Sequence, residues 1–208
     1  MTTSRPKTYT EQEILNRVFD APNNGLRLNQ YDALFNVRTG DGYFFGAGVV
    51  IGTTPALGAD TLYGIPIYVP RTMTFDRIAI HVTTGAVSSN IRLGIHKLGT
   101  NLYPGVLVLD AGEVDSATTG VKTITISQQL AKGLYFVALV SNGTPSVAGA
   151  SPTSFGAVFG LIATDFANYN NRWAVAFTYA ALPDPFTAGG TLQNANVPII
   201  GLRPLSMD

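Results

Sequence analysis

The two histidines of the chain, His81 and His96, are its first candidates for metal binding or acid–base chemistry. Each lies in a run of alternating apolar and polar residues. If the two runs pair as a hairpin around residues 85–88, His81 faces Arg92 and His96 faces Arg77. A metal ion there would meet like-charge repulsion from the arginines and would lack carboxylate ligands. The pattern therefore favours cross-strand histidine–arginine pairs, either solvated or in an interface, and predicts no metal site.

Acidic residues gather in one place, at Asp110, Glu113 and Asp115. Alternation along a strand puts Glu113 and Asp115 on one face and Asp110 on the other. Carboxylates bind Ca²⁺, but the spacing of a calcium loop is absent. A glycosidase pair would need a carboxyl group with a raised pKa in a cleft, and nothing marks one. The G-x-S-x-G, P-loop and H-E-x-x-H motifs are also absent. We expect a protein without catalytic residues or cofactors.

The single tryptophan lies in the run Tyr169–Trp173, YNNRW. Aromatic rings beside amides can stack on a sugar and form hydrogen bonds with its hydroxyl groups. Tyr169, Asn171 and Trp173 are therefore candidate glycan contacts. The same tryptophan could instead anchor a core or an interface, with its N–H group hydrogen-bonded inside the protein.

The elements that would position these residues are β-strands, because short apolar–polar alternations follow one another without a helical crossover. Such strands pair mainly antiparallel, which predicts an all-β sandwich or jelly roll over residues 56–208. Pro66 cannot donate a hydrogen bond to a neighbouring strand, so the strand around it is expected at a sheet edge. The predicted strands are Tyr63–Val69, Met73–Gly85, Ser89–Leu98, Val106–Ser116, Val121–Leu130, Leu134–Ser141, Ala157–Ile162, Arg172–Tyr179 and Val197–Leu202.

Residues 1–55 differ from the rest and read as an attachment arm. Thr10 and Glu13 form a capping box that begins a short helix. Its apolar stripe, which packs either on its own β domain or on another subunit, consists of Ile14, Leu15, Val18 and Phe19. Farther along, the glycines of residues 46–52 lack the G-x-G-x-x-G spacing of a dinucleotide site. That stretch is better interpreted as an extended arm with the aromatic anchors Tyr43, Phe44 and Phe45.

Composition restricts the partners. The 208 residues include 13 basic and 13 acidic side chains and no cysteine, so the formal net charge is zero. Without a basic cluster, nucleic acid is a poor partner. Apolar runs are too short to span a membrane as a helix, and residues 1–7 lack the apolar core of a signal peptide. Only 12% of the residues are charged, about half the usual ~25%. Either uncharged polar groups cover the surface or much of it is buried in an assembly.

The start of the chain, Tyr9–Asp20 (YTEQEILNRVFD) followed by Asn24–Leu28 (NGLRL), resembles that of tailed-bacteriophage virion proteins. Tyr63–Val69, Thr74–Thr84 and Gly120–Ser141, with Gly133–Phe136 (GLYF), are similar to β-sandwich modules of head-decoration and tail-fibre proteins. The resemblance covers about half of the chain.

This resemblance implies a jelly roll displayed on the virion, often as a homotrimer and assembled in the host cytoplasm. The expected function is a non-enzymatic capsid decoration, or cement, protein. The alternative is a tail-fibre or receptor-binding component that recognises host carbohydrate. The expected partners are the major capsid protein or another virion protein, and further copies of the chain. The residues expected to bind them are Tyr9, Ile14, Leu15, Val18, Phe19, Tyr43, Phe44 and Phe45.

Overall fold

The computed structural model describes residues 39–40, 42–45, 51–152, 159, 161–162 and 165–207, and only the backbone of residues 161–162, 165–169 and 207. These residues belong to one compact unit, Val37–Asp208. The predicted helix and its apolar stripe, with Tyr9, lie outside the described residues.

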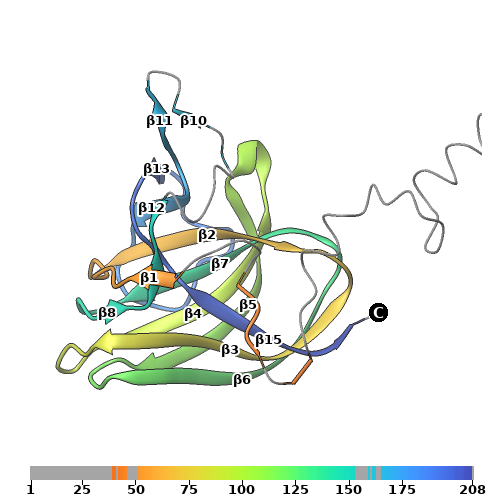
Figure 1. Ribbon diagram of the computed structural model, residues 1–208, viewed down its shortest axis with the longest axis horizontal. Helices are drawn as coiled ribbons and strands as arrows, with labels where there is room; N and C mark the ends of the chain where they lie inside the picture. The colour runs from red at the N-terminus through yellow and green to blue at the C-terminus, as the bar shows by residue number, and fades with distance from the viewer. Residues whose placement is uncertain are drawn as a thin grey trace, which may run out of the picture. The chain divides into compact units, whose positions relative to one another are not determined.

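Two antiparallel sheets make up most of the described structure (Figure 1). Sheet I has six strands in the order β13-β12-β2-β7-β4-β5, and sheet II has the order β15-β3-β6 with β8 as a fourth strand beside β3. The bounds in sheet I are β2 Thr61–Val69, β4 Asn90–Leu98, β5 Pro104–Asp115, β7 Gly133–Ser141, β12 Arg172–Ala176 and β13 Thr191–Gln193. Those in sheet II are β3 Met73–Thr84, β6 Gly120–Leu130, β8 Ser146–Val147 and β15 Ile200–Met207.

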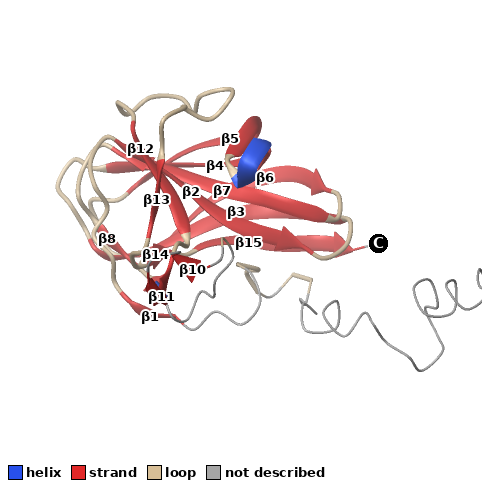
Figure 2. Ribbon diagram, turned by 90° about the horizontal axis from the view of Figure 1, so that it is seen from above, coloured by secondary structure: helices blue, strands red, loops and turns tan. Residues whose placement is uncertain are grey.

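Smaller elements complete the described part of the chain. One small sheet has the order β1-β9-β14, with bounds Ile51–Thr53, Gly149–Ala150 and Val197–Pro198. A separate hairpin joins β10 (Leu161–Ile162) to β11 (Asp165–Tyr169) and extends away from the large sheets in Figure 1. A short 3₁₀ turn, Thr100–Leu102, precedes β5, and Figure 2 draws it as the helix near that strand.

The strand pairing has a nested order that produces a sandwich. β2 pairs with β7, β3 with β6 and β4 with β5, all antiparallel. One long double ribbon therefore passes from sheet I to sheet II and back, which is the way a jelly roll is wrapped. The pairing of β4 with β7 closes sheet I. The prediction of an antiparallel all-β sandwich is confirmed.

The core follows from the period of two that the sequence shows. Ile78, Ile80 and Val82 of β3 and Ile91, Leu93 and Ile95 of β4 are all buried. Burying each such side chain contributes about 1.5–3 kcal/mol relative to leaving it in water. β7 is buried from Phe136 to Ser141, as expected for a central strand that is apolar on both faces.

The predicted hairpin of residues 73–98 is wrong, because β3 and β4 lie in different sheets. The chain crosses between the sheets after Gly85, where any Cβ atom would collide with the carbonyl group of Ala117. His81 consequently lies opposite Val121, and His96 lies opposite Leu107 and Phe136. The predicted histidine–arginine pairs do not form.

The prediction of an edge position for β2 is also wrong, since β2 lies between β12 and β7. Its pairing with β12 nevertheless ends at Gly64, whereas its pairing with β7 continues through Pro66. The proline lies where one side of the strand has lost its neighbour. A missing N–H group costs nothing there, which is why a proline is tolerated inside the sheet.

The outer face of sheet I is covered as well. The connection between β12 and β13 places Leu182 and Phe186 against Leu62, Ala138 and Val140 in a second buried cluster. This explains why His96, on the expected polar face, is fully buried: its ring meets that of Phe186 edge-on at 5.2 Å. The connection between β12 and β13, residues 177–190, thus acts as a lid over the outer face of sheet I.

Candidate functional site

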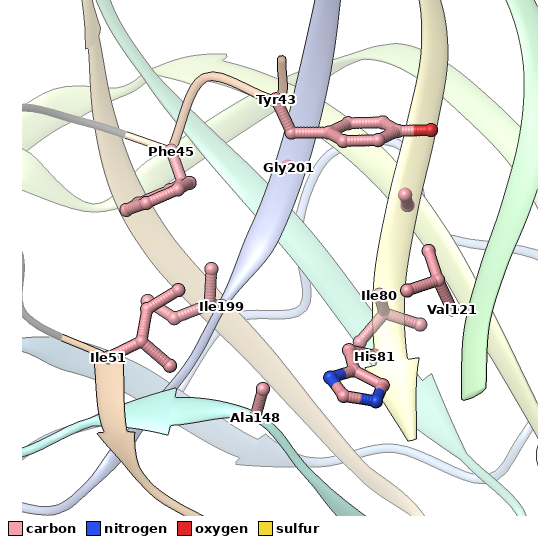
Figure 3. Close-up of a pocket in the computed structure, with 10 residues that line it drawn as sticks. Tyr43, Phe45, Ile51, Ile80, His81, Val121, Ala148, Ile199 and Gly201 are labelled. Atoms are coloured by element: carbon pink, nitrogen blue, oxygen red, sulfur yellow. The ribbon is translucent and has the colours of Figure 1, made fainter. Parts of the chain in front are cut away.

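The outer face of sheet II carries an apolar hollow of about 210 Å³ (Figure 3). Tyr43 and Phe45 line one side, and His81 and Val121 line another. The complete lining is Tyr43, Phe45, Ile51, Ala79, Ile80, His81, Val121, Ala148, Ile199 and Gly201. These residues come from several separate segments of the chain, which the sandwich brings together.

The hollow is deep because the residues at its floor, Gly201 and Ala79, have little or no side chain. Gly201 of β15 pairs with Ala79 of β3, so their outward positions lie side by side on the sheet. A Cβ atom on Gly201 would lie 2.6 Å from the Cβ of Tyr43. The absence of a side chain at this position is therefore what allows Tyr43 to lie flat against the sheet and form a wall of the hollow.

The segment that carries the aromatic anchors runs along the free edge of β15. The Gly40 amide donates to the Pro204 carbonyl at 2.9 Å, and Phe44 and Leu202 exchange backbone hydrogen bonds of 2.7 and 2.8 Å. Phe44 is 4% exposed and packs within its own domain. Of the three predicted anchors, Tyr43 and Phe45 face the hollow and Phe44 holds the segment in place.

The chemistry of the hollow is that of an apolar contact surface. Ile51 is 48% exposed and Val121 is 60% exposed at its rim, and the imidazole of His81 is the one titratable ring in the lining besides the Tyr43 phenol. A nucleophile activated by a base is absent from this lining. The hollow suits an apolar side chain of a partner, whose burial would release water from both surfaces.

The predicted acidic cluster is a structural network. Arg92 Nε lies 2.9 Å from both carboxylate oxygens of Asp110, and Tyr179 donates to Glu113 at 2.5 Å. Asp110 also accepts from the Leu182 amide at 3.1 Å, which fastens the lid to sheet I. Burial, followed by the hydrogen bond to Glu113, raises the pKa of Tyr179.

The predicted faces of this cluster need one correction. Asp110 lies opposite Gly94 and Glu113 lies opposite Arg92, so both carboxylates point to the outer face of sheet I. The register shifts between these pairs at Gly112, whose φ of +98° favours glycine. One extra residue reverses the alternation, and Asp110 therefore does not point to the opposite face. Asp115, 57% exposed, pairs with Lys122 at the end of the strand.

His96 is buried as a neutral ring. Its Nδ1–H group donates to the Gly105 carbonyl at 3.0 Å, whereas Nε2 is buried without a partner. Burial lowers the pKa of His96, outweighing the opposing effects of the Gly105 hydrogen bond and of Asp184 and Asp110.

The predicted glycan contacts have separate environments. Trp173 donates its indole N–H to the Leu102 carbonyl at 2.8 Å and meets the Tyr103 ring edge-on at 4.7 Å. Asn171 is fully buried and donates to the Ala195 carbonyl at 2.9 Å. The side chain of Tyr169 lies outside the described ones. Trp173 therefore offers a sugar only the part of its ring that remains accessible.

The described residues contain no group of three or more histidine and acidic side chains that could hold a metal ion. Within the same part of the chain, no helix has the length and apolar character needed to cross a membrane.

Sequence reasoning identified Tyr43 and Phe45 but missed the rest of the hollow. Ala79, Ala148 and Gly201 carry no chemical signal, and their proximity depends on the pairing of strands distant in sequence. Val121, an exposed apolar residue at a solvent-facing position of a predicted strand, was a local sign of an apolar surface. Comparison with models of protein families, with curated proteins and with solved structures finds no match to this chain.

Proposed function

We propose that this protein is a non-enzymatic structural component of a tailed-phage virion, in which it decorates the head and stabilises it. The hollow on sheet II carries this proposal because an apolar recess lined by Tyr43 and Phe45 suits docking and holds no nucleophile paired with a base. The resemblance of residues 9–28 to virion proteins and the 12% charged fraction also support it.

The proposed attachment uses two parts of the chain. Residues 1–38 precede a segment that is attached to β15 by the Gly40 and Phe44 hydrogen bonds. A partner that bound the arm would therefore be connected to sheet II through this segment. One apolar side chain of the capsid, buried in the hollow, would contribute about 1.5–3 kcal/mol. Deletion of residues 1–25 should weaken binding to particles, and unchanged binding would exclude the arm.

Localisation on the particle tests the function itself. Virions of the phage that encodes this sequence would be purified and examined by cryo-EM, with an antibody against the recombinant chain as a label. Density and label on the head support the proposal. Absence of the chain from purified virions would overturn it, and label on the tail alone would exclude head decoration.

A charge at the rim tests the hollow. Ile51→Glu should reduce binding of the purified protein to virions that lack it, because a carboxylate at this site would have to be buried without a partner. Val87→Glu is the matched control, since Val87 is 94% exposed and lies outside the hollow. Equal binding by the two variants, with equal thermal stability, would exclude the hollow as the docking site.

The second candidate function is recognition of host-surface carbohydrate by a tail component. The cluster of Trp173 with Tyr103 and Phe159, whose rings lie 4.7 and 6.1 Å from the indole, favours it because aromatic faces can stack on sugars. The isolated protein would then bind members of a glycan array, and Trp173→Ala would abolish this signal. An array without hits would remove this candidate.

A further inference from the structure

β6 lies at an outer edge of sheet II. β6 ends sheet II, and among the described residues it pairs only with β3. It spans eleven residues, Gly120–Leu130. Such an edge presents alternate N–H and C=O groups that are unpaired within the sheet and can accept another strand.

The other edges of the two large sheets differ from this one. The edge of β15 is bonded by Gly40 and Phe44. β5 is bonded by the lid, since Asp184 accepts from the Leu107 amide at 3.0 Å and the Phe186 amide donates to the Gly105 carbonyl at 3.0 Å. β13 has only three residues. In the described part of the chain, β6 is therefore the one long edge without such cover.

β6 also lacks the usual protection against pairing. From Thr123 to Leu130 it contains no charged residue and no proline, the two residue types that most often block an edge. Lys122 lies near one end, where its ammonium group contacts Thr118 at 2.7 Å and Asp115 at 3.6 Å. The exposed positions of the strand, from Val121 through Thr123, Thr125 and Ser127 to Gln129, carry uncharged side chains.

We propose that β6 pairs antiparallel with β6 of a second copy of this chain, so that the two sheets II form one continuous sheet across a two-fold axis. Full overlap of a strand that spans residues 120–130 places the axis at Thr125. Thr123 then lies opposite Ser127 of the other copy, and Val121 lies opposite Gln129. This register brings no like charges together, and it places Ile124 opposite Ile126 of the other copy, as well as Thr123 opposite Ser127, which are pairs of similar character.

A second copy is favoured over an unrelated strand because the edge is complementary to itself and the chain has no net charge to oppose self-association. The inference does not depend on the virion function. The proposed dimer differs from the homotrimer implied by the resemblance, so the measured mass of the assembly distinguishes the two oligomeric states.

The first test measures the mass of the full chain by sedimentation over a dilution series. The proposal expects a species of twice the 22.0 kDa chain mass. The double variant Thr123→Lys and Ser127→Lys places like charges opposite each other in two symmetric pairs, and should weaken the dimer about tenfold or more. The matched variant Thr123→Lys and Ser127→Glu places opposite charges there and should remain dimeric. A monomer at all concentrations, a trimer, or equal masses for the two variants would overturn the proposal.

The second test uses the absence of cysteine from the chain. Opposed residues of antiparallel strands have Cα atoms about 4.5–5.5 Å apart, which a disulfide can bridge. Thr125→Cys should therefore form a disulfide-linked dimer under mild oxidation, whereas the exposed control Val87→Cys should stay monomeric on a non-reducing gel. The two-fold register would be excluded if the two variants cross-linked equally, or if Thr125→Cys formed no disulfide-linked dimer.

Discussion

Tyr43 lies directly against Gly201, whose missing side chain leaves room for the ring: an added Cβ atom would come within 2.6 Å of the Tyr43 Cβ and 3.1 Å of its Cγ. The glycine is required here by the close approach of another segment. This contact allows residues 42–45 to lie along β15 and to form a wall of the hollow. A single methyl group at position 201 should therefore disturb the placement of residues 42–45 along β15 and also the wall of the hollow.

Gly201→Ala is expected to displace Tyr43 and to lower the free energy of unfolding by about 1–3 kcal/mol, the usual cost of overpacking. Urea denaturation measures the loss, and hydrogen exchange of residues 39–45 should become faster. Gly52→Ala is the control, since a Cβ atom there meets nothing within 4 Å. Equal stability of the two variants would show that Tyr43 does not depend on the glycine.

Asp110 connects β5, Arg92 and the lid through three sets of hydrogen bonds, to Arg92 Nε and to the amides of Gly112 and Leu182. Asp110→Asn keeps the shape and removes the charge. We expect a loss of about 1.5–3 kcal/mol of unfolding free energy, as for hydrogen bonds to a charged group. Thermal denaturation measures it. Asp115→Asn, on the same strand but 57% exposed, should cost less, and the reverse order would contradict the role of Asp110.

Phe186 is the principal anchor of the lid, with an exposed fraction of 3% and ring contacts to His96 and Tyr103. Phe186→Ala should lower the free energy of unfolding by about 3–5 kcal/mol, because it removes a buried ring and leaves a cavity. The matched control is Leu205→Ala, since Leu205 is 58% exposed and its loss should change stability by less than about 0.5 kcal/mol. Comparable urea midpoints for the two variants would mean that the lid does not stabilise the domain.

Alternation along the chain predicted strands β2 to β7 well because the period of two is a local property. The expected Val121–Leu130 and Leu134–Ser141 differ by one residue from the observed Gly120–Leu130 and Gly133–Ser141. Alternation does not show which strands pair with each other. A short connection after residue 84 is compatible with a hairpin and equally with a crossing between sheets. The obstacle at Gly85 is the Ala117 carbonyl, which lies more than thirty residues away in sequence.

The features of the site that the sequence did not predict also depend on contacts between residues distant in sequence. The bulge at Gly112 moved Asp110 to the face of Glu113, and no local pattern marks an extra residue in a strand. The sequence does not mark the lid as a buried element, because Leu182 and Phe186 are isolated apolar residues in a segment rich in alanine, proline and glycine. Their partners Ala138 and Val140 already had a place in the predicted strand Leu134–Ser141, so a second buried face could not be anticipated.

The burial of His96 beneath this lid predicts a dependence of stability on pH. Because burial lowers the pKa of His96 in the folded state, the unfolded chain, with a histidine pKa near 6.5, binds more protons between the two values. Stability is therefore fully present above the unfolded pKa and is lost as the pH falls through about 6.5 toward the folded value. Thermal denaturation between pH 8 and pH 5 should show this loss.

The nearby charges set the conditions of this test. Asp184 and Asp110 oppose the effect of burial on the pKa of His96. His96→Asn retains a donor for the Gly105 carbonyl at the position of Nδ1, but cannot titrate. This variant should therefore lose less stability between pH 8 and pH 5 than the wild type. His81→Asn removes the other, exposed histidine and should keep the full loss. If His96→Asn and the wild type lost stability in parallel, protonation of His96 would not be the cause.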